Sequence, residues 1–416
     1  MRFLTAGMPG VGGRLKSEPE DFRVDEIALW DPSGEGPHLR LRVEKRGMTT
    51  HEAAQRLARA LRISERDVGF AGIKDSRAVA TQWFSVPAAC ESRLGDLTHP
   101  WLAIRETARD SRKLRIGELE GNRFEIVLRE VAPDAAERAR ELLAVLVRRG
   151  VPNWFGAQRF GTKGDSDLLG RALVRGDCDE AIRFYLGRPA ARERDPRIRA
   201  ARQLFDEGRL EESERAFPPR LRTEALVLRA LRQHGDSFRA LFKIPRRLRL
   251  LFLSAYQARM FNRCLEARFD TLDRLLEGDV AVRRNTGREV AVADPAREQP
   301  LVDAFELSPA GPIFGPGLVR AAGEAGRIEE EVFAAEELDP EERRQVFPDL
   351  HLRGERRPYR FPVAAAAAEP HPTLAGALTL RFTLPRGCYA TSLVAEITKS
   401  EPDRDAGAAV GTVAPA

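Results

Sequence analysis

The residue of this sequence best suited to acid–base or nucleophilic chemistry is Asp75. It stands in a short glycine-containing segment between two apolar runs, and two cations, Lys74 and Arg77, flank it. Nearby cations favour the ionised form of a carboxylate, and a loop between strands can present a side chain to a substrate. The segment alone leaves a second interpretation open, because an aspartate that stabilises a surface turn has the same neighbours in sequence.

Seven stretches of the chain form an ordered set of motifs. The stretch around Asp75 has the pattern Gly72-x-Lys74-Asp75-x-x-Ala78-x-x-Thr81-Gln82. The other six are residues 14–26, 33–38 with 43–45, 121–124, 151–161, 254–257 with 261–262, and 384–391. In this order, and over residues 14–398, the set resembles the TruD family of tRNA pseudouridine synthases. One such motif would be weak, whereas seven in order are specific.

The resemblance implies an isomerase that converts a uridine of tRNA, uridine 13 of the D arm, into pseudouridine. This reaction breaks the N1–C1′ bond of the nucleotide and joins C5 of the same base to C1′, and it implies neither a cofactor nor a metal. The resemblance gives Asp75 the catalytic role. A carboxylate has two ways to fill that role, since it can attack C1′ as a nucleophile or remove a proton from C2′. The sequence leaves both open.

A carboxylate of this kind needs a cationic partner. Lys74 is adjacent in sequence, but neighbouring residues of an extended strand point in opposite directions. We therefore expect the partner of Asp75 to be Lys16 or an arginine elsewhere in the chain. Lys16, Lys74, Gln158 and Arg159 are the possible supporting residues. Arg159 is suited either to contact a phosphate or to a structural role at the junction of two domains.

The target uridine must leave its stack to reach a carboxylate on a protein, and an unstacked base is held by aromatic rings and by hydrogen bonds to its edge. The resemblance places Phe22, Asn122, Phe124 and Tyr389 around that base. The Asn122 amide both donates and accepts, as a uracil edge requires, and Phe124 and Tyr389 would sandwich the ring. Plain core packing is the alternative role of Phe22 and Phe124.

Three positions depart from the family's pattern. Cys388 stands where serine is usual in the closing motif, Trp154 replaces a more usual tyrosine, and Ala395 stands where an arginine is common. None of these changes removes the carboxylate. The Ala395 change removes an ion pair or RNA contact that the pattern implies.

Strand and helix patterns surround the motifs in the first part of the chain. Residues 38–43 and 123–128 have the composition of strands, and the first of these runs alternates apolar with polar residues. Thr49 and Glu52 form a capping-box pattern at the start of a helix. Residues 133–150 predict a second helix, with proline near its start and glycine at its end.

Later segments have a different character. Residues 165–247 predict helices rich in arginine and glutamate, and residues 247–269 a longer helix. Residues 276–318 read as strands and turns, and the acidic run 329–331 predicts a solvated helix face. The alanines and prolines of 364–372 indicate a linker or variable loop, and residues 391–397 a closing helix or strand.

This succession predicts an α+β fold. The catalytic domain would be built on a mainly antiparallel sheet, and the family resemblance implies that an α/β TruD-specific domain is inserted into it. We therefore expect a discontinuous catalytic domain over residues 1–154 and 364–398, and the inserted domain over 155–363. Residues 401–416 are small and polar, which predicts a disordered tail.

The composition of the 416 residues fits an RNA partner. The formal net charge is +5, and the basic residues are mostly arginine, which binds phosphate bidentately and stacks on bases. No apolar run reaches the length of a membrane span, and the first residues lack the pattern of a signal peptide. We therefore expect a cytoplasmic protein without membrane contact, and by resemblance a monomer. The four cysteines are far apart, which predicts free thiols.

Two other classes of function remain for comparison. A non-catalytic tRNA-binding protein or RNA folding chaperone on the same scaffold would also be arginine-rich, and so would an unrelated binding module. The joint presence of Asp75, Asn122 and Phe124 argues against the first, because binding alone does not need the carboxylate, and the ordered motifs argue against the unrelated module.

Overall fold

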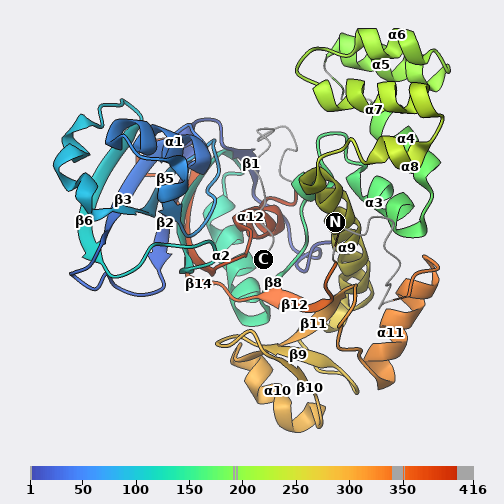
Figure 1. Ribbon diagram of the computed structural model, residues 1–416. Helices are drawn as coiled ribbons and strands as arrows, with labels where there is room; N and C mark the ends of the chain where they lie inside the picture. The colour runs from blue at the N-terminus through green and yellow to red at the C-terminus, as the bar shows by residue number, and fades with distance from the viewer. Residues whose placement is uncertain (1, 191–192, 194, 340–349, 351, 401–416) are drawn as a thin grey trace. The chain divides into compact units, whose positions relative to one another are not determined.

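The structure, a computed structural model, describes residues 2–190, 193, 195–339, 350 and 352–400. The chain divides into two compact units (Figure 1). The first comprises Met1–Asn153 and Phe361–Ala416, and the second Trp154–Arg360. The chain leaves the first unit one residue earlier, and returns to it three residues earlier, than the predicted domain boundaries. The predicted tail, 401–416, lies outside the described residues.

The first unit is built on one sheet of nine strands. Its order is β14-β15-β7-β2-β5-β3-β6, with β1 also paired to β7 and β4 to β5. Its strands are β1 (Gly12–Leu15), β2 (Phe22–Ala28), β3 (His38–Arg46), β4 (Gly69–Phe70), β5 (Val79–Pro87), β6 (Leu102–Asp110), β7 (Leu119–Val131), β14 (Ala364–Pro370) and β15 (Ala377–Pro385). Only β2 and β5 run parallel, so the predicted mainly antiparallel sheet is confirmed.

Three helices cover the sheet. They are α1 (Thr50–Leu61), α2 (Ala135–Arg149) and α12 (Ala390–Thr398), the last of which decides between the helix and strand predicted there. Thr49 caps α1 as predicted, because its Oγ1 accepts a hydrogen bond of 3.0 Å from the Glu52 backbone N–H. The Glu52 carboxylate bonds to Arg56 instead of closing the box.

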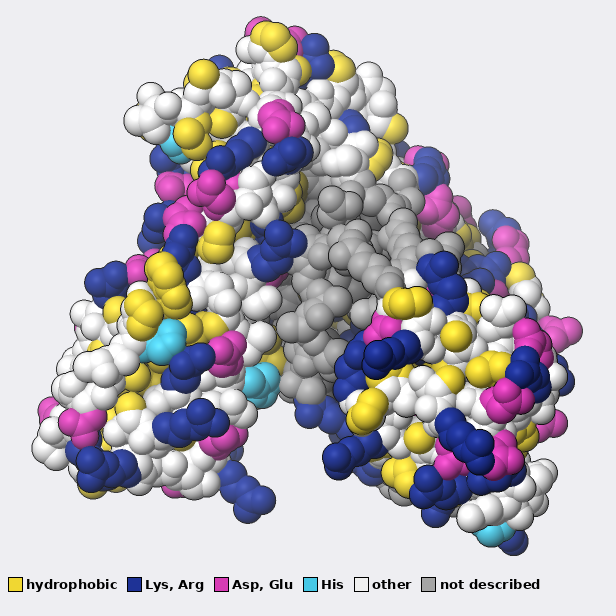
Figure 2. All heavy atoms as spheres, turned by 90° about the horizontal axis from the view of Figure 1, so that it is seen from above, with side chains coloured by type: hydrophobic (Ala, Val, Ile, Leu, Met, Phe, Trp, Pro, Cys, Tyr) yellow, Lys and Arg dark blue, Asp and Glu magenta, His cyan; other side chains and the backbone are white. Residues whose placement is uncertain are grey.

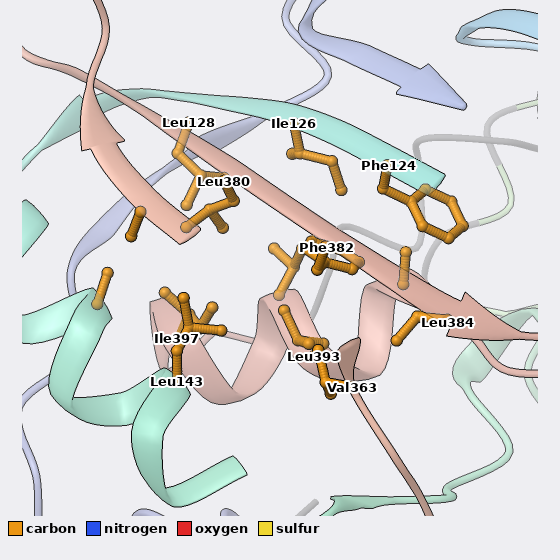
Figure 3. Close-up of a cluster of buried hydrophobic side chains, with 14 of the residues drawn as sticks. Phe124, Ile126, Leu128, Leu143, Val363, Leu380, Phe382, Leu384, Leu393 and Ile397 are labelled. Atoms are coloured by element: carbon orange, nitrogen blue, oxygen red, sulfur yellow. The ribbon is translucent and has the colours of Figure 1, made fainter. Parts of the chain in front are cut away.

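Two apolar clusters lie on the covered face of the sheet. One joins β7 and β15 to α2 and α12, where Phe124, Phe382 and Leu393 meet (Figure 3). The other joins β3 and β5 to α1. Both are on the same face, since Ala80 belongs to the first and Phe84 to the second, and even positions of one strand point to the same side. A polar zone remains between them.

The linker predicted at residues 364–372 is wrong, because residues 364–370 form the edge strand β14. It pairs with β15, and the Arg140 guanidinium donates to the Ala368 carbonyl at 3.1 Å. A run of alanines has no alternation of apolar and polar residues from which a strand can be predicted. The backbone hydrogen bonds to β15, and not the side chains, make this segment a strand.

The second unit combines helices with a four-stranded antiparallel sheet. That sheet has the order β10-β9-β11-β12. Its strands are β9 (Val280–Arg283), β10 (Glu289–Ala291), β11 (Leu307–Ile313) and β12 (Glu355–Pro358). Its helices are α3 (Ser166–Arg175), α4 (Cys178–Leu186), α5 (Pro196–Asp206), α6 (Leu210–Ala216), α7 (Arg222–His234), α8 (Ser237–Leu241), α9 (Arg246–Ala267), α10 (Pro295–Asp303) and α11 (Gly323–Ala334). The two-residue strands β8 (Val151–Pro152) and β13 (Arg360–Phe361) lie at the unit boundaries.

Two expectations for the second unit need correction. Residues 276–318 contain the helix α10 besides strands and turns; Asp294 caps it and Pro295 begins it. The acidic run does lie on a helix, α11, but Glu329 is buried and paired with the Arg356 guanidinium at 2.5 Å. Since a buried carboxylate needs a cation, Arg356 explains why this glutamate faces inward.

The surface carries charged side chains of both signs, and the four cysteines are not joined in disulfides. Figure 2 shows basic and acidic side chains interspersed over the face in view. The cysteines are free thiols, as predicted, with Cys90 and Cys264 buried and Cys178 and Cys388 partly buried. Within the described part of the chain, no helix combines the length and apolar character needed to cross a membrane.

Candidate active site

A row of polar side chains crosses three adjacent strands of the first unit between the two apolar clusters. The pairing of Asp25 with Thr81 sets Glu26 of β2 beside Gln82 of β5, and Glu26 is directly opposite Asn122 of β7. Gln82 and Glu26 are buried. The row is therefore a continuous polar strip in the floor of the covered face.

The loop between β4 and β5 is fastened to this strip. The Gln82 amide donates to the Gly72 carbonyl at 3.0 Å, and the Lys74 ammonium lies 2.5 Å from the Glu26 carboxylate. The Thr50 hydroxyl connects Gln82 to the loop. It donates to the Gln82 amide oxygen and accepts from the Lys74 backbone N–H, each at 2.9 Å. Both members of the Lys74–Glu26 pair are at least 95% buried. The loop therefore has little freedom to move.

Asp75 stands on this loop as predicted, and its carboxylate has a partner for each oxygen. One oxygen forms an ion pair with the Lys16 ammonium, and the other accepts a 2.9 Å hydrogen bond from the Arg77 backbone N–H. The partner expected from Lys16 or an arginine is thus Lys16, while Lys74 points the opposite way to Glu26. About a quarter of the Asp75 side chain is exposed, so a ligand can reach it.

Lys16 adopts an unusual backbone conformation to reach this position. Its φ is +58°, in the left-handed region that costs a non-glycine residue about 1–2 kcal/mol. It follows β1 directly, and its ammonium group lies 4.3 Å from the centre of the Phe22 ring. Strain of this kind gathers at functional sites, where surrounding contacts enforce it. Here the ion pair with Asp75 is such a contact.

The four residues predicted to surround the base differ in their burial and contacts. The Oδ1 atom of Asn122 is buried, and no hydrogen-bond partner for it is present in the described residues. Phe22 and Phe124 are in edge contact at 6.0 Å, and Phe124 stacks on Phe382 at 5.3 Å. Both phenylalanines therefore pack in the core, which is the alternative role that the sequence left open. Tyr389, at the start of α12, is 42% exposed, and its place against a base stays a prediction.

Residues 1–397 match the family model described as tRNA pseudouridine synthase D (TruD). The chain is 44% identical to the tRNA pseudouridine synthase D of Geobacter metallireducens over 97% of this chain and 99% of the other.

The chain belongs to the TruD family.

Members of this family are isomerases, and the chain is accordingly an enzyme of that class. A second relative, from Geobacter sulfurreducens, is also 44% identical over 96% of this chain and 97% of its own length. The fold agrees as well. The crystal structure of the putative tRNA pseudouridine synthase D from Methanosarcina mazei has a TM-score of 0.84 and 28% identity, with 97% of each chain covered.

Two of the possible supporting residues predicted from the sequence lie in the second unit. Gln158 and Arg159 belong to a single 3-10 turn, and the Arg159 guanidinium lies 5.5 Å from the Phe155 ring. Asn262 fixes the neighbouring backbone, since its amide bonds to both the N–H and the carbonyl of Phe155 at 2.9 Å. This explains why the motifs 151–161 and 261–262 occur together. A role of Gln158 or Arg159 toward substrate stays a prediction.

Lys45 is the site residue that the sequence did not single out. It is fully buried, and its ammonium group donates to the Asp75 carbonyl at 2.8 Å and to the Met48 carbonyl at 2.6 Å. The sequence did contain a signal for the burial of Lys45. Side chains alternate between the two faces of β3, so Lys45 points to the same buried face as Leu41 and Val43. Lys45 therefore holds the backbone that carries the Asp75 carboxylate.

Lys45 should make the stability of the protein depend on pH. Burial lowers the pKa of Lys45 to about 8, an effect to which the charge of Lys74 adds and which Asp75 opposes; in an unfolded chain the pKa is about 10.4. Between these two pKa values the unfolded chain binds more protons than the folded protein, so the free energy of unfolding rises with pH. Below the pKa of the folded protein, this contribution does not change with pH. The neutral amine keeps two N–H donors for its two carbonyls.

The measurement compares chemical unfolding of the wild type and Lys45→Met across this window. Between about pH 7.5 and 9.5, the wild type should gain about 2 kcal/mol relative to the variant. Other lysines are common to both proteins and cancel. Parallel pH curves for the two proteins would contradict this account of Lys45.

Proposed function

We propose that this enzyme converts a uridine in the D arm of tRNA, by family resemblance uridine 13, into pseudouridine. The observation that carries the proposal is the Asp75 carboxylate, which is partly open to solvent and paired with the buried Lys16. The loop that carries Asp75 is held to the sheet by the ion pair of Lys74 with Glu26. A rigid, charged group beside a reachable space is what a reaction at the ribose requires. Family membership supplies the class of reaction.

The chemistry is an isomerisation in which the atoms balance without a further reactant. The N1–C1′ bond breaks, a C5–C1′ bond forms, the C5 hydrogen leaves as a proton, and N1 gains one. No net oxidation occurs, so we propose that no cofactor takes part. Asp75 either attacks C1′ and is later displaced by C5, or removes the C2′ proton to give a glycal and returns a proton to C2′ when C5 bonds to C1′.

The two routes differ in one measurable respect. Replacing the C2′ hydrogen of the target nucleotide by deuterium slows the proton-abstraction route, because that C–H bond breaks in it. The nucleophilic route leaves the same bond intact and should show an isotope effect close to one. Single-turnover rates on the two RNAs therefore assign the role of Asp75.

Recognition of the uracil edge is proposed for Asn122. Its buried Oδ1 without a hydrogen-bond partner among the described residues would accept from the uracil N3–H. Phe22, Phe124 and Tyr389 would supply apolar contact, with the exposed Tyr389 ring free to pack on the base. Gln158 and Arg159 of the second unit are proposed to support the RNA backbone.

The substrate and the site also suggest a cellular location and an oligomeric state. We propose a cytoplasmic protein, because tRNA is its partner, and a monomer, because one copy carries Lys16, Asp75 and Asn122 together. Sedimentation of the protein with and without tRNA tests the second statement. A stable dimer in both samples would contradict it.

Release of the C5 hydrogen tests the proposed reaction. A tRNA transcript with tritium at C5 of its uridines should release about one equivalent of label per tRNA to water, because the new C–C bond replaces that hydrogen. A transcript whose D arm has been replaced by an unrelated hairpin should release none. Release without the D arm would contradict the proposed target, and no release from either RNA would contradict the reaction.

A further inference from the structure

Ile73 is a large apolar residue that is 39% exposed on the loop of the catalytic carboxylate. Lys74, which follows it, is buried against Glu26, and Asp75 is open to solvent again. Burial thus alternates along the three residues, as it does in extended backbone. Ile73 and Asp75 therefore point to the same side of the loop, opposite to the side chain of Lys74.

The backbone on both sides of Ile73 is fixed. The Ala71 carbonyl accepts from the Gly117 N–H at 2.8 Å, the Gly72 carbonyl from Gln82, and the Lys74 N–H donates to Thr50. A single exposed isoleucine is common on protein surfaces. This one is held on a rigid support, so it cannot turn into the core, and it stands beside the reacting group.

The spacing of Ile73 from Asp75 corresponds to about two base steps of a nucleic-acid strand. Two residues of extended chain span about 6.6 Å, and stacked bases along one strand are about 3.4 Å apart. When the ribose of an extruded uridine lies at Asp75, Ile73 is therefore within reach of the stack that the base has left. Proteins that open nucleic-acid stacks insert apolar side chains between base steps.

We propose that Ile73 is a wedge that enters the RNA stack beside the target uridine and keeps it open. The inference rests on the proposed function, since it assumes that the uridine is extruded toward Asp75. Arg77, exposed on the same loop, offers a charge to the neighbouring phosphate. Extrusion costs a few kcal/mol of stacking, and less where the base is already unstacked.

The test compares Ile73→Ala on two RNAs. The first is the native D-arm substrate, and in the second the nucleotide next to the target uridine is abasic, so the stack is already open. The single-turnover rate should fall about 10- to 100-fold on the native RNA and by less than about threefold on the abasic RNA. Val147→Ala, at an aliphatic residue on α2 that is 41% exposed, is the matched control and should behave as the wild type on both.

A second readout does not depend on turnover. With 2-aminopurine next to the target, binding of Asp75→Asn should raise the fluorescence, because the probe becomes unstacked, and binding of the double variant with Ile73→Ala should not. An equal loss of rate on both RNAs, no loss on either, or the same fluorescence change in both proteins overturns the wedge. If the wild type makes no pseudouridine on either RNA, the proposed function fails, and the fluorescence still decides the role of Ile73.

Discussion

Asp75→Asn should lower the single-turnover rate of pseudouridine formation by roughly 10⁴-fold or more, to a level near the background of the assay. Asparagine keeps the shape of the side chain and can keep the hydrogen bond from the Arg77 N–H. It removes the negative charge on which both proposed routes at the ribose depend. The Lys16 ammonium would then lose its ion-pair partner in a buried position.

Binding of tRNA should change little in the same variant. A single carboxylate contributes little to holding a polyanion, so affinity should stay within about threefold of the wild type. Asp31→Asn, at an exposed aspartate in the loop after β2, is the matched control and should retain full activity. If Asp75→Asn keeps more than about a tenth of the wild-type rate, the carboxylate is not the catalytic group.

Lys74→Met should destabilise the first unit by about 3–5 kcal/mol, because it leaves the Glu26 carboxylate buried without its cation. The same change frees one anchor of the Asp75 loop, so the rate of the reaction should fall with the stability. The double variant Glu26→Gln/Lys74→Met removes both charges and should recover a large part of the lost stability. Urea unfolding of the wild type, the single variants Lys74→Met and Glu26→Gln, and the double variant, followed by a probe in the first unit, gives the coupling free energy.

An exposed ion pair of the same sheet provides the control. Arg105 and Glu44 are paired at 2.6 Å with the arginine side chain 56% exposed, and Arg105→Met should cost less than about 1 kcal/mol. Equal effects of Lys74→Met and Arg105→Met, or a double variant less stable than Lys74→Met, would contradict the anchoring role given to the Lys74–Glu26 pair.

Local patterns were enough to predict the position of the loop that carries Asp75. Glycine and flanking charges indicated a loop at Asp75, alternation indicated β3, and Thr49 indicated the start of α1. These features depend on residues close together in sequence. The opposed directions of Lys74 and Asp75 also followed from the geometry of extended chain alone.

Contacts between distant segments were not predictable in the same way. Glu329 faces inward because Arg356, 27 residues later, pairs with it. The alanines of β14 form a strand because β15 offers an edge. Lys45 reaches the Asp75 carbonyl only once β3 and the loop are packed together. The sequence offered Lys16 or an arginine as the partner of Asp75, while the choice of Lys16 and the strain at its backbone are visible only in the structure.

The most direct test of the central claim maps pseudouridine at single-nucleotide resolution in a tRNA pool treated with the wild type or with Asp75→Asn. We expect new pseudouridine at one D-arm uridine with the wild type and none there with the variant. Equal modification by both proteins would contradict the role of Asp75. No modification by either, although both bind tRNA tightly, would contradict the enzymatic function and favour an RNA-binding chaperone.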